Sequence, residues 1–103
     1  MIEKRVLAPE RLRRVPEQFS WVDHRLVRQA WIRRCDPRGL ALYLLLVTVA
    51  DVEGLSYYSD EKASILLSLT PSDLREARRQ LIHADLIAYE RPLYQVLSLG
   101  GAA

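Results

Sequence analysis

The sequence predicts a mostly helical domain of the α+β class that ends in a small β-hairpin. Two pairs, Asp36–Pro37 and Thr70–Pro71, each join a helix-capping side chain to a proline, a combination that favours the start of a helix. The run 40–50 is apolar apart from a threonine and is far shorter than the roughly 20 residues of a membrane span, which indicates a buried helix. Residues 86–90 and 94–99 are short runs of β-forming side chains around a proline-containing turn, which predicts the hairpin.

Length and composition fit one small globular domain. The chain has 103 residues, of which 50% are hydrophobic and 27% are charged, so it is expected to fold around one modest core. We divide it into a basic N-terminal arm (1–18), a domain (19–99) and a tail (100–103). The single cysteine, Cys35, excludes an internal disulfide and suits a reducing cytoplasm. The N-terminus lacks the apolar segment of a signal peptide, so we expect a cytoplasmic protein without membrane contact.

The charge of the chain is uneven along its length. Residues through Arg38 include ten basic and five acidic side chains, a net charge of +5, whereas the remainder has a net charge of −3. Such asymmetry suggests an anionic partner for the basic part, although a solvated arginine-rich surface explains the charge equally well. Arg11, Arg13 and Arg14 of the arm are the expected contacts to phosphate, and they would add affinity that depends on salt but not on sequence.

The first half of the domain is expected to begin with an extended stretch, 19–22. Asp23 can then cap a helix that runs to Arg34. Trp21 and Trp31 are large apolar side chains in a short chain, and we assign both to the core in preference to a role in stacking on bases.

The second half contains the predicted core helix, which starts at Pro37, and a tight succession of short elements. A β-like stretch at 55–58 follows Gly54, and Ser59 can cap a short helix over 60–68. Leu69 and Thr70 then lead directly into the next helix. Asp85 stands where glycine usually ends a helix, and aspartate tolerates the left-handed backbone better than most residues do.

The helix that starts at Pro71 is amphipathic. Leu74, Ala77 and Leu81 fall within about 60° of one another around its axis, which predicts a face that docks on the core. Arg78 lies near the edge of that stripe, so we expect its methylenes along the core and its guanidinium outside. The opposite face consists of Ser72, Glu76, Arg79 and His83, flanked by Arg75 and Gln80. Glu76 can pair with Arg79 or Gln80 along the helix. In a short basic protein this helix is a candidate recognition helix.

The order helix, short strand, helix, tight turn, helix, hairpin is that of a winged helix-turn-helix. The stretch LSLTPSDLREARRQLIHADLI resembles the helix-turn-helix of GntR-type regulators and the winged helices of bacterial replication-initiator and primosomal proteins. LALYLLLVTVADVEGLSYYSD resembles the preceding helix and strand of the replication group. Arg78 replaces a usually apolar residue, and Asp85 replaces the usual exit glycine. The matching positions are Leu69, Thr70, Leu74, Arg75, Ala77, Leu81, Asp85, Leu86 and Ile87.

The chain also resembles small bacterial proteins encoded near transposable elements, through RRVPEQFSWVDHRLV and YERPLYQVLSL. These resemblances imply binding to double-stranded DNA by site occupancy, as a transcriptional regulator or an accessory factor of replication or transposition, with a homodimer as the expected form. The alternative is a winged-helix module that binds a protein partner and makes no direct DNA contact. The implied DNA contacts are Thr70, Ser72, Arg75, Glu76, Arg79 and His83, with Arg91 at the hairpin tip.

The sequence lacks the components of an enzyme site. It has two histidines, one cysteine and no spaced set of metal ligands. No glycine-rich phosphate loop and no nucleophile motif is present. His24 is expected at a helix start rather than as a base, and Cys35 as a small buried side chain. We therefore expect no catalysis, no cofactor and no metal.

Overall fold

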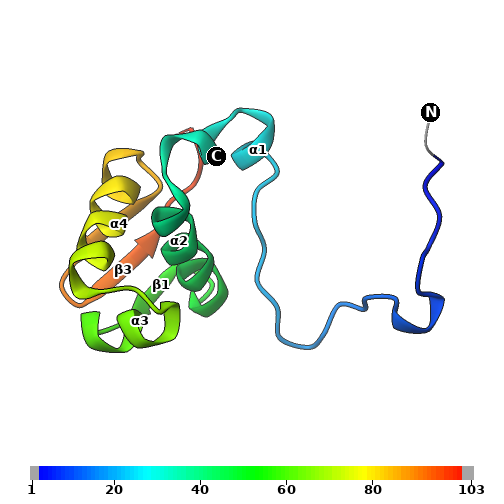
Figure 1. The fold of residues 1–103 in the computed structure, drawn as a ribbon, viewed down its shortest axis with the longest axis horizontal. Coiled ribbons are helices and arrows are strands. Elements are labelled where there is room, and N and C mark those ends of the chain that lie inside the picture. The colour runs from blue at the N-terminus through cyan, green and yellow to red at the C-terminus, as the bar shows by residue number, and fades with distance from the viewer. Residues whose placement is uncertain (1–2, 101–103) are drawn as a thin grey trace.

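A computed structural model describes residues 3–100 and has the predicted α+β composition, with helices on one side of a small sheet (Figure 1). The helices are α1 (Arg25–Arg28), α2 (Pro37–Val49), α3 (Asp60–Leu67) and α4 (Pro71–His83), with 3₁₀ turns at Pro9–Arg11 and Trp31–Arg34. The strands are β1 (Leu55–Tyr57), β2 (Ile87–Glu90) and β3 (Leu93–Val96). No helix within residues 3–100 is long and apolar enough to cross a membrane.

The sheet is antiparallel, with strand order β1-β3-β2. The central strand β3 pairs Gln95 with Leu55 of β1 and with Ala88 of β2. The predicted hairpin is confirmed, but its second strand begins at Leu93 and ends at Val96, so it is shorter than the sequence suggested. Tyr94 of β3 is fully buried and anchors the sheet against the helices.

The core lies mainly between α2 and α4, as the apolar run in α2 predicted. Leu42 and Leu46 of α2 and Leu74 and Leu81 of α4 are completely buried. Burying a leucine side chain stabilises the fold by about 1.5–3 kcal/mol. Leu44 on the outer side of α2 remains exposed, so that helix is covered on most of its surface but not on all of it.

Three of the four predicted helix caps are present. Asp36 accepts from the amide of Arg38 (2.8 Å), Ser59 from that of Lys62 (3.1 Å) and Thr70 from that of Asp73 (3.0 Å). Each cap satisfies an amide that the first turn of its helix leaves without a partner.

The stop after α4 is also as expected. Asp85 adopts a left-handed backbone (φ 63°), and the next amide, that of Leu86, donates to the carbonyl of Leu81 at 3.0 Å. This bond turns the chain at the end of α4 directly into β2.

The continuous helix predicted from Asp23 to Arg34 is wrong. The helix α1 ends after four residues, and Ala30 takes a left-handed backbone before the 3₁₀ turn that starts at Trp31. A continuous helix would hold Leu26 and Trp31 about 140° apart, because five residues advance roughly 500°. Both are buried, so the break is what allows the two side chains to face one core. Asp23 accepts from the amide of Arg25 (2.8 Å), but His24 is the N-cap of α1 and no side chain caps this helix, so the predicted cap at Asp23 is wrong as well.

Residues 3–16 lead away from the body of the molecule (Figure 1), whereas 17–22 run beside it, and each side chain of the segment 3–22 is exposed. The assignment of Trp21 to the core is therefore wrong, since its side chain is 75% exposed, whereas Trp31 is 7% exposed and confirmed as a core residue. Ser20 ties the segment to the body by donating from its hydroxyl to the carbonyl of Thr48 (2.9 Å).

Candidate nucleic-acid interface

The helix α4 presents two chemically different faces. Leu74, Ala77 and Leu81 are fully buried, which confirms the predicted docking stripe. The opposite face is open to solvent and contains Ser72, Arg75, Arg79, Ile82 and His83. Glu76, also assigned to this face, is half-buried.

A three-residue connection fixes α4 against α3. Ser68 takes a left-handed backbone (φ 56°) at the end of α3, and the amide of Leu69 donates to the carbonyl of Ser64 at 3.1 Å. Thr70 then caps α4. The start of α4 is exposed at Thr70, Pro71 and Ser72, so its free amides and positive dipole end face solvent.

Arg79, a predicted base contact, is engaged within its own helix. Its Nε donates to Glu76 Oε1 at 2.8 Å, and its Nη2 donates to the other carboxylate oxygen. The Arg79 guanidinium, and then the Gln80 amide, lower the pKa of Glu76 to about 2. The pairing expected from the sequence is thus confirmed, and Arg79 is not immediately available to a partner.

A polar network joins the start of α2 to the outer side of α4. Gln80 donates to the Asp36 carboxylate (2.9 Å) and accepts from the Asp36 amide (2.9 Å). Arg38 pairs with Asp36 (2.7 Å) and with Asp73 (2.9 Å). The hydrogen bonds from Arg38 and Gln80 hold the pKa of Asp36 well below its usual range. No local pattern in the sequence indicates this network, because its members lie up to 44 residues apart.

Arg78 does not behave as predicted. Its side chain is only 13% exposed, and its guanidinium pairs with Asp60 (2.7 Å) and donates to the buried hydroxyl of Tyr94 (2.9 Å). The guanidinium also lies over the ring of Tyr89, 4.4 Å from its centroid. The charge therefore points inward, where it links α4 to α3 and to the sheet.

Arg75 and Arg91 are exposed and form no ion pair among residues 3–100. The hydrogen bond from Arg78 is the main cause of the lowered pKa of Asp60, and the charges of Arg91 and Arg75 lower it further. Both arginines are thus close enough to act on the carboxylate at the start of α3. The Tyr58 amide donates to the Pro92 carbonyl (3.3 Å), which holds the hairpin turn beside that same start.

The predicted site residues therefore fall into two groups. Those of α4 and the hairpin turn border one side of the body. Arg11, Arg13 and Arg14 belong to the segment that Figure 1 shows leading away from the far side of α2, so the structure does not bring them together with α4.

Within the described part of the chain, no group of three or more histidine, cysteine or carboxylate side chains could hold a metal ion. Cys35 is half-buried, and burial, followed by the charge of Asp36, raises the pKa of its thiol. Comparison of the chain with protein-family models, curated proteins and solved structures finds no match.

Proposed function

We propose that this chain is a winged helix-turn-helix protein that binds double-stranded DNA and inserts α4 into the major groove. Three features support the fold assignment: the order α2, β1, α3, α4, β2, β3, the short connection between α3 and α4, and a sheet in which β3 lies between β1 and β2. The short turn between β2 and β3 would be the wing. The resemblance to GntR-type regulators and replication winged helices supports the same assignment.

The observation that carries the proposal is which arginines around α4 form ion pairs and which do not. Arg38, Arg78 and Arg79 are all neutralised by carboxylates, whereas Arg75 and Arg91 are exposed without an ion pair in the described chain. Arg75 lies one helical turn after the capped start of α4, the part of a recognition helix that reaches base edges. A free guanidinium there can donate to guanine O6 and N7 or to phosphate.

The acidic residues of α4, Asp73 and Glu76, would repel phosphate, but both are paired with basic side chains. Asp73 is paired with Arg38, and Glu76 is paired with Arg79 and bonded to Gln80. The negative charge that phosphate would meet is thereby reduced, and the positive dipole end of α4 and Arg75 dominate the exposed start of the helix. Arg79 would become a second contact if its guanidinium left the ion pair with Glu76 and bound DNA instead.

A fluorescence-anisotropy titration with labelled random duplex DNA tests the proposal directly. We expect binding at low salt that weakens steeply as salt rises, because arginine–phosphate contacts release counterions. Selection from a random library should then enrich a specific site. Absence of binding at low salt would refute DNA binding and leave the protein-interaction alternative.

Changing Glu76 to glutamine should strengthen DNA binding by roughly two- to fivefold, equivalent to about 0.5–1 kcal/mol for one surface charge. The change removes a negative charge near the phosphates and releases Arg79. The matched control is Asp85→Asn, which makes the same change in charge in the exposed turn after α4, where asparagine also tolerates the left-handed backbone. Equal gains for the two variants would show that net charge alone is measured and that the Glu76–Arg79 pair has no part in recognition.

In the cell, such a protein would act by occupying its site, as a transcriptional regulator or as an accessory factor of replication or transposition. The second candidate function, a protein-interaction module, is favoured by a separate observation. Large apolar side chains are exposed along the N-terminal segment, among them Leu7, Val15 and Trp21. Exposed apolar groups in such number mark surfaces that bind other proteins.

A further inference from the structure

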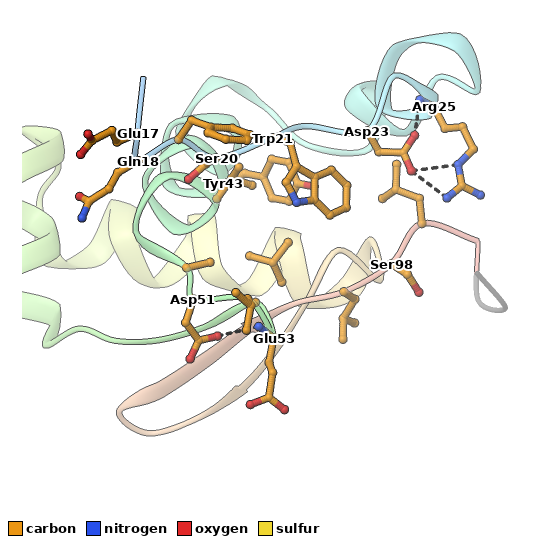
Figure 2. Close-up of a pocket in the computed structure, with 18 residues that line it drawn as sticks. Glu17, Gln18, Ser20, Trp21, Asp23, Arg25, Tyr43, Asp51, Glu53 and Ser98 are labelled. Atoms are coloured by element: carbon orange, nitrogen blue, oxygen red, sulfur yellow. Dashed lines mark hydrogen bonds and ion pairs between the residues drawn. The ribbon is translucent and has the colours of Figure 1, made fainter. Parts of the chain in front are cut away.

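A groove of about 860 Å³ runs between the segment 17–23 and the body of the molecule. Its floor includes Tyr43 and Val47 of α2, and the loop before β1 and the residues after β3 form its other side. Figure 2 shows Trp21 beside Tyr43, with Asp51 and Glu53 across the groove. Segment 17–23 and α2 line the groove and no residue of α4 does, and Figure 1 shows the N-terminal segment and α4 on opposite sides of α2.

Apolar groups of this groove are left uncovered by the chain itself. Trp21 is 75% exposed and Phe19 65% exposed, and Val52 on the opposite rim is exposed completely. Aromatic side chains of this size contribute most when they are removed from water. An exposed tryptophan and phenylalanine in one groove therefore indicate a surface that is covered in an assembly.

The rim of the groove is acidic. Glu17, Asp51 and Glu53 carry negative charge there, while Asp23 is neutralised by Arg25 through an ion pair of 2.7 Å. A carboxylate oxygen of Asp51 accepts from the amides of Glu53 and Leu55, each at 2.9 Å, and these bonds hold the loop in place. An occupant must bring apolar side chains for the floor and positive charge for the rim.

Residues 4–15 have this composition. They carry five basic residues against one acidic residue, a net charge of +4. Between the charges stand Val6, Leu7, Leu12 and Val15, which are 54–85% exposed. Extended, these twelve residues reach up to roughly 40 Å, enough to cross a groove of this size.

The arm of the same molecule is poorly placed to fill the groove. Residues 17–23 already form one of its walls, and the chain before them leads away from the body (Figure 1). Val15 precedes a proline, which favours an extended backbone and disfavours the sharp reversal that folding back requires. The arm of another molecule meets no such constraint.

We propose that residues 4–15 of one molecule bind in the groove of a second copy of this chain, and that the exchange is reciprocal in a two-fold symmetric dimer. Leu12 and Val15 cover Trp21 and Phe19, and Arg13 and Arg14 face Glu53 and Glu17. This interface is independent of α4, so its test requires no DNA and can fail separately from the proposed function.

The test is sedimentation velocity of the full chain over a wide range of protein concentrations. We expect a concentration-dependent dimer. Glu53→Lys and Arg13→Glu should each weaken it at least about tenfold, because each places like charges opposite one another. Both side chains are exposed, so the fold should be unaffected, which circular dichroism verifies.

A mixture of the two variants provides the decisive measurement. In a heterodimer, the lysine introduced at position 53 of one molecule meets the glutamate introduced at position 13 of the other. The reciprocal interface keeps its original side chains, so dimers should return to nearly wild-type strength. Glu61→Lys on α3 has the same change in charge outside the groove and should leave the dimer intact.

Three results would overturn the proposal. The first is a wild-type protein that stays monomeric at every concentration, which is also the result expected if the arm binds the groove of its own molecule. The second is a dimer that neither variant weakens, and the third is a mixture of the two variants that does not recover.

Discussion

Replacing Arg75 by alanine should weaken binding to a selected DNA site by roughly 5- to 150-fold, the equivalent of about 1–3 kcal/mol for a bidentate base contact. The reason is that Arg75 is the exposed arginine near the start of α4 that no carboxylate of the described chain neutralises. Its side chain does not have to leave an ion pair before it meets a base. Anisotropy titrations of the site and of random duplex, both at one moderate salt concentration, measure the change.

The control for Arg75 is Arg28→Ala, which removes the same charge from an exposed position on α1. It should weaken specific and random binding alike and by a few-fold at most. Arg79→Ala should lie between the two, because the loss of its contact is partly offset by the pair with Glu76 that no longer has to be broken. If Arg75→Ala and Arg28→Ala prove equivalent, the exposed face of α4 does not read DNA.

Replacing Asp60 by asparagine should destabilise the fold by about 1–3 kcal/mol. Asp60 itself is 41% exposed, which reduces the cost, but its partner Arg78 is 13% exposed and would be left with an uncompensated charge next to Tyr94. Urea unfolding measures the effect as a lower midpoint with an unchanged slope.

The pH dependence of stability gives this prediction a second readout. Arg78 holds the pKa of Asp60 in the folded protein below its ordinary value of 3.8. The ionised Asp60 therefore contributes fully to the free energy of unfolding above pH 3.8, and this contribution is lost as pH falls through the lower, folded-state pKa. The Asp60→Asn variant should therefore lose less stability than the wild type over that acidic range. A double-mutant cycle with Arg78→Met isolates the pair, since methionine keeps much of the contact with Tyr89. A coupling energy near zero would contradict the assigned role.

Local signals account for the parts of the fold that the sequence predicts well. The caps at Asp36, Ser59 and Thr70 depend on side chains within three residues of the amides they satisfy. The apolar stripe of α4 depends on helical spacing alone, and it correctly separated the buried leucines from the exposed face. The left-handed stop at Asp85 follows from the same local chemistry.

The predictions fail where contacts between distant parts of the chain determine the structure. Trp21 has the large apolar side chain that is typical of core residues. Whether other residues bury it depends on where segment 3–22 lies, which no local pattern encodes. The broken helix at Ala30 follows from the need to bury both Leu26 and Trp31. Arg78 turns inward because its partners Asp60 and Tyr94 lie there, 18 and 16 residues away. At the candidate site, exposure of Arg75 was predictable, whereas the neutralisation of Arg38 was not.

The network between Asp36, Arg38, Asp73 and Gln80 has a consequence for motion. Together with the leucine core, it fastens the start of α2 to the outer side of α4, so the two helices should open to solvent only as one cooperative unit. Amide hydrogen exchange would then be uniformly slow in the middle of both helices and fast throughout residues 3–22. The body of the molecule is therefore already ordered before it meets a partner. The entropic cost of association then comes almost entirely from ordering the N-terminal segment.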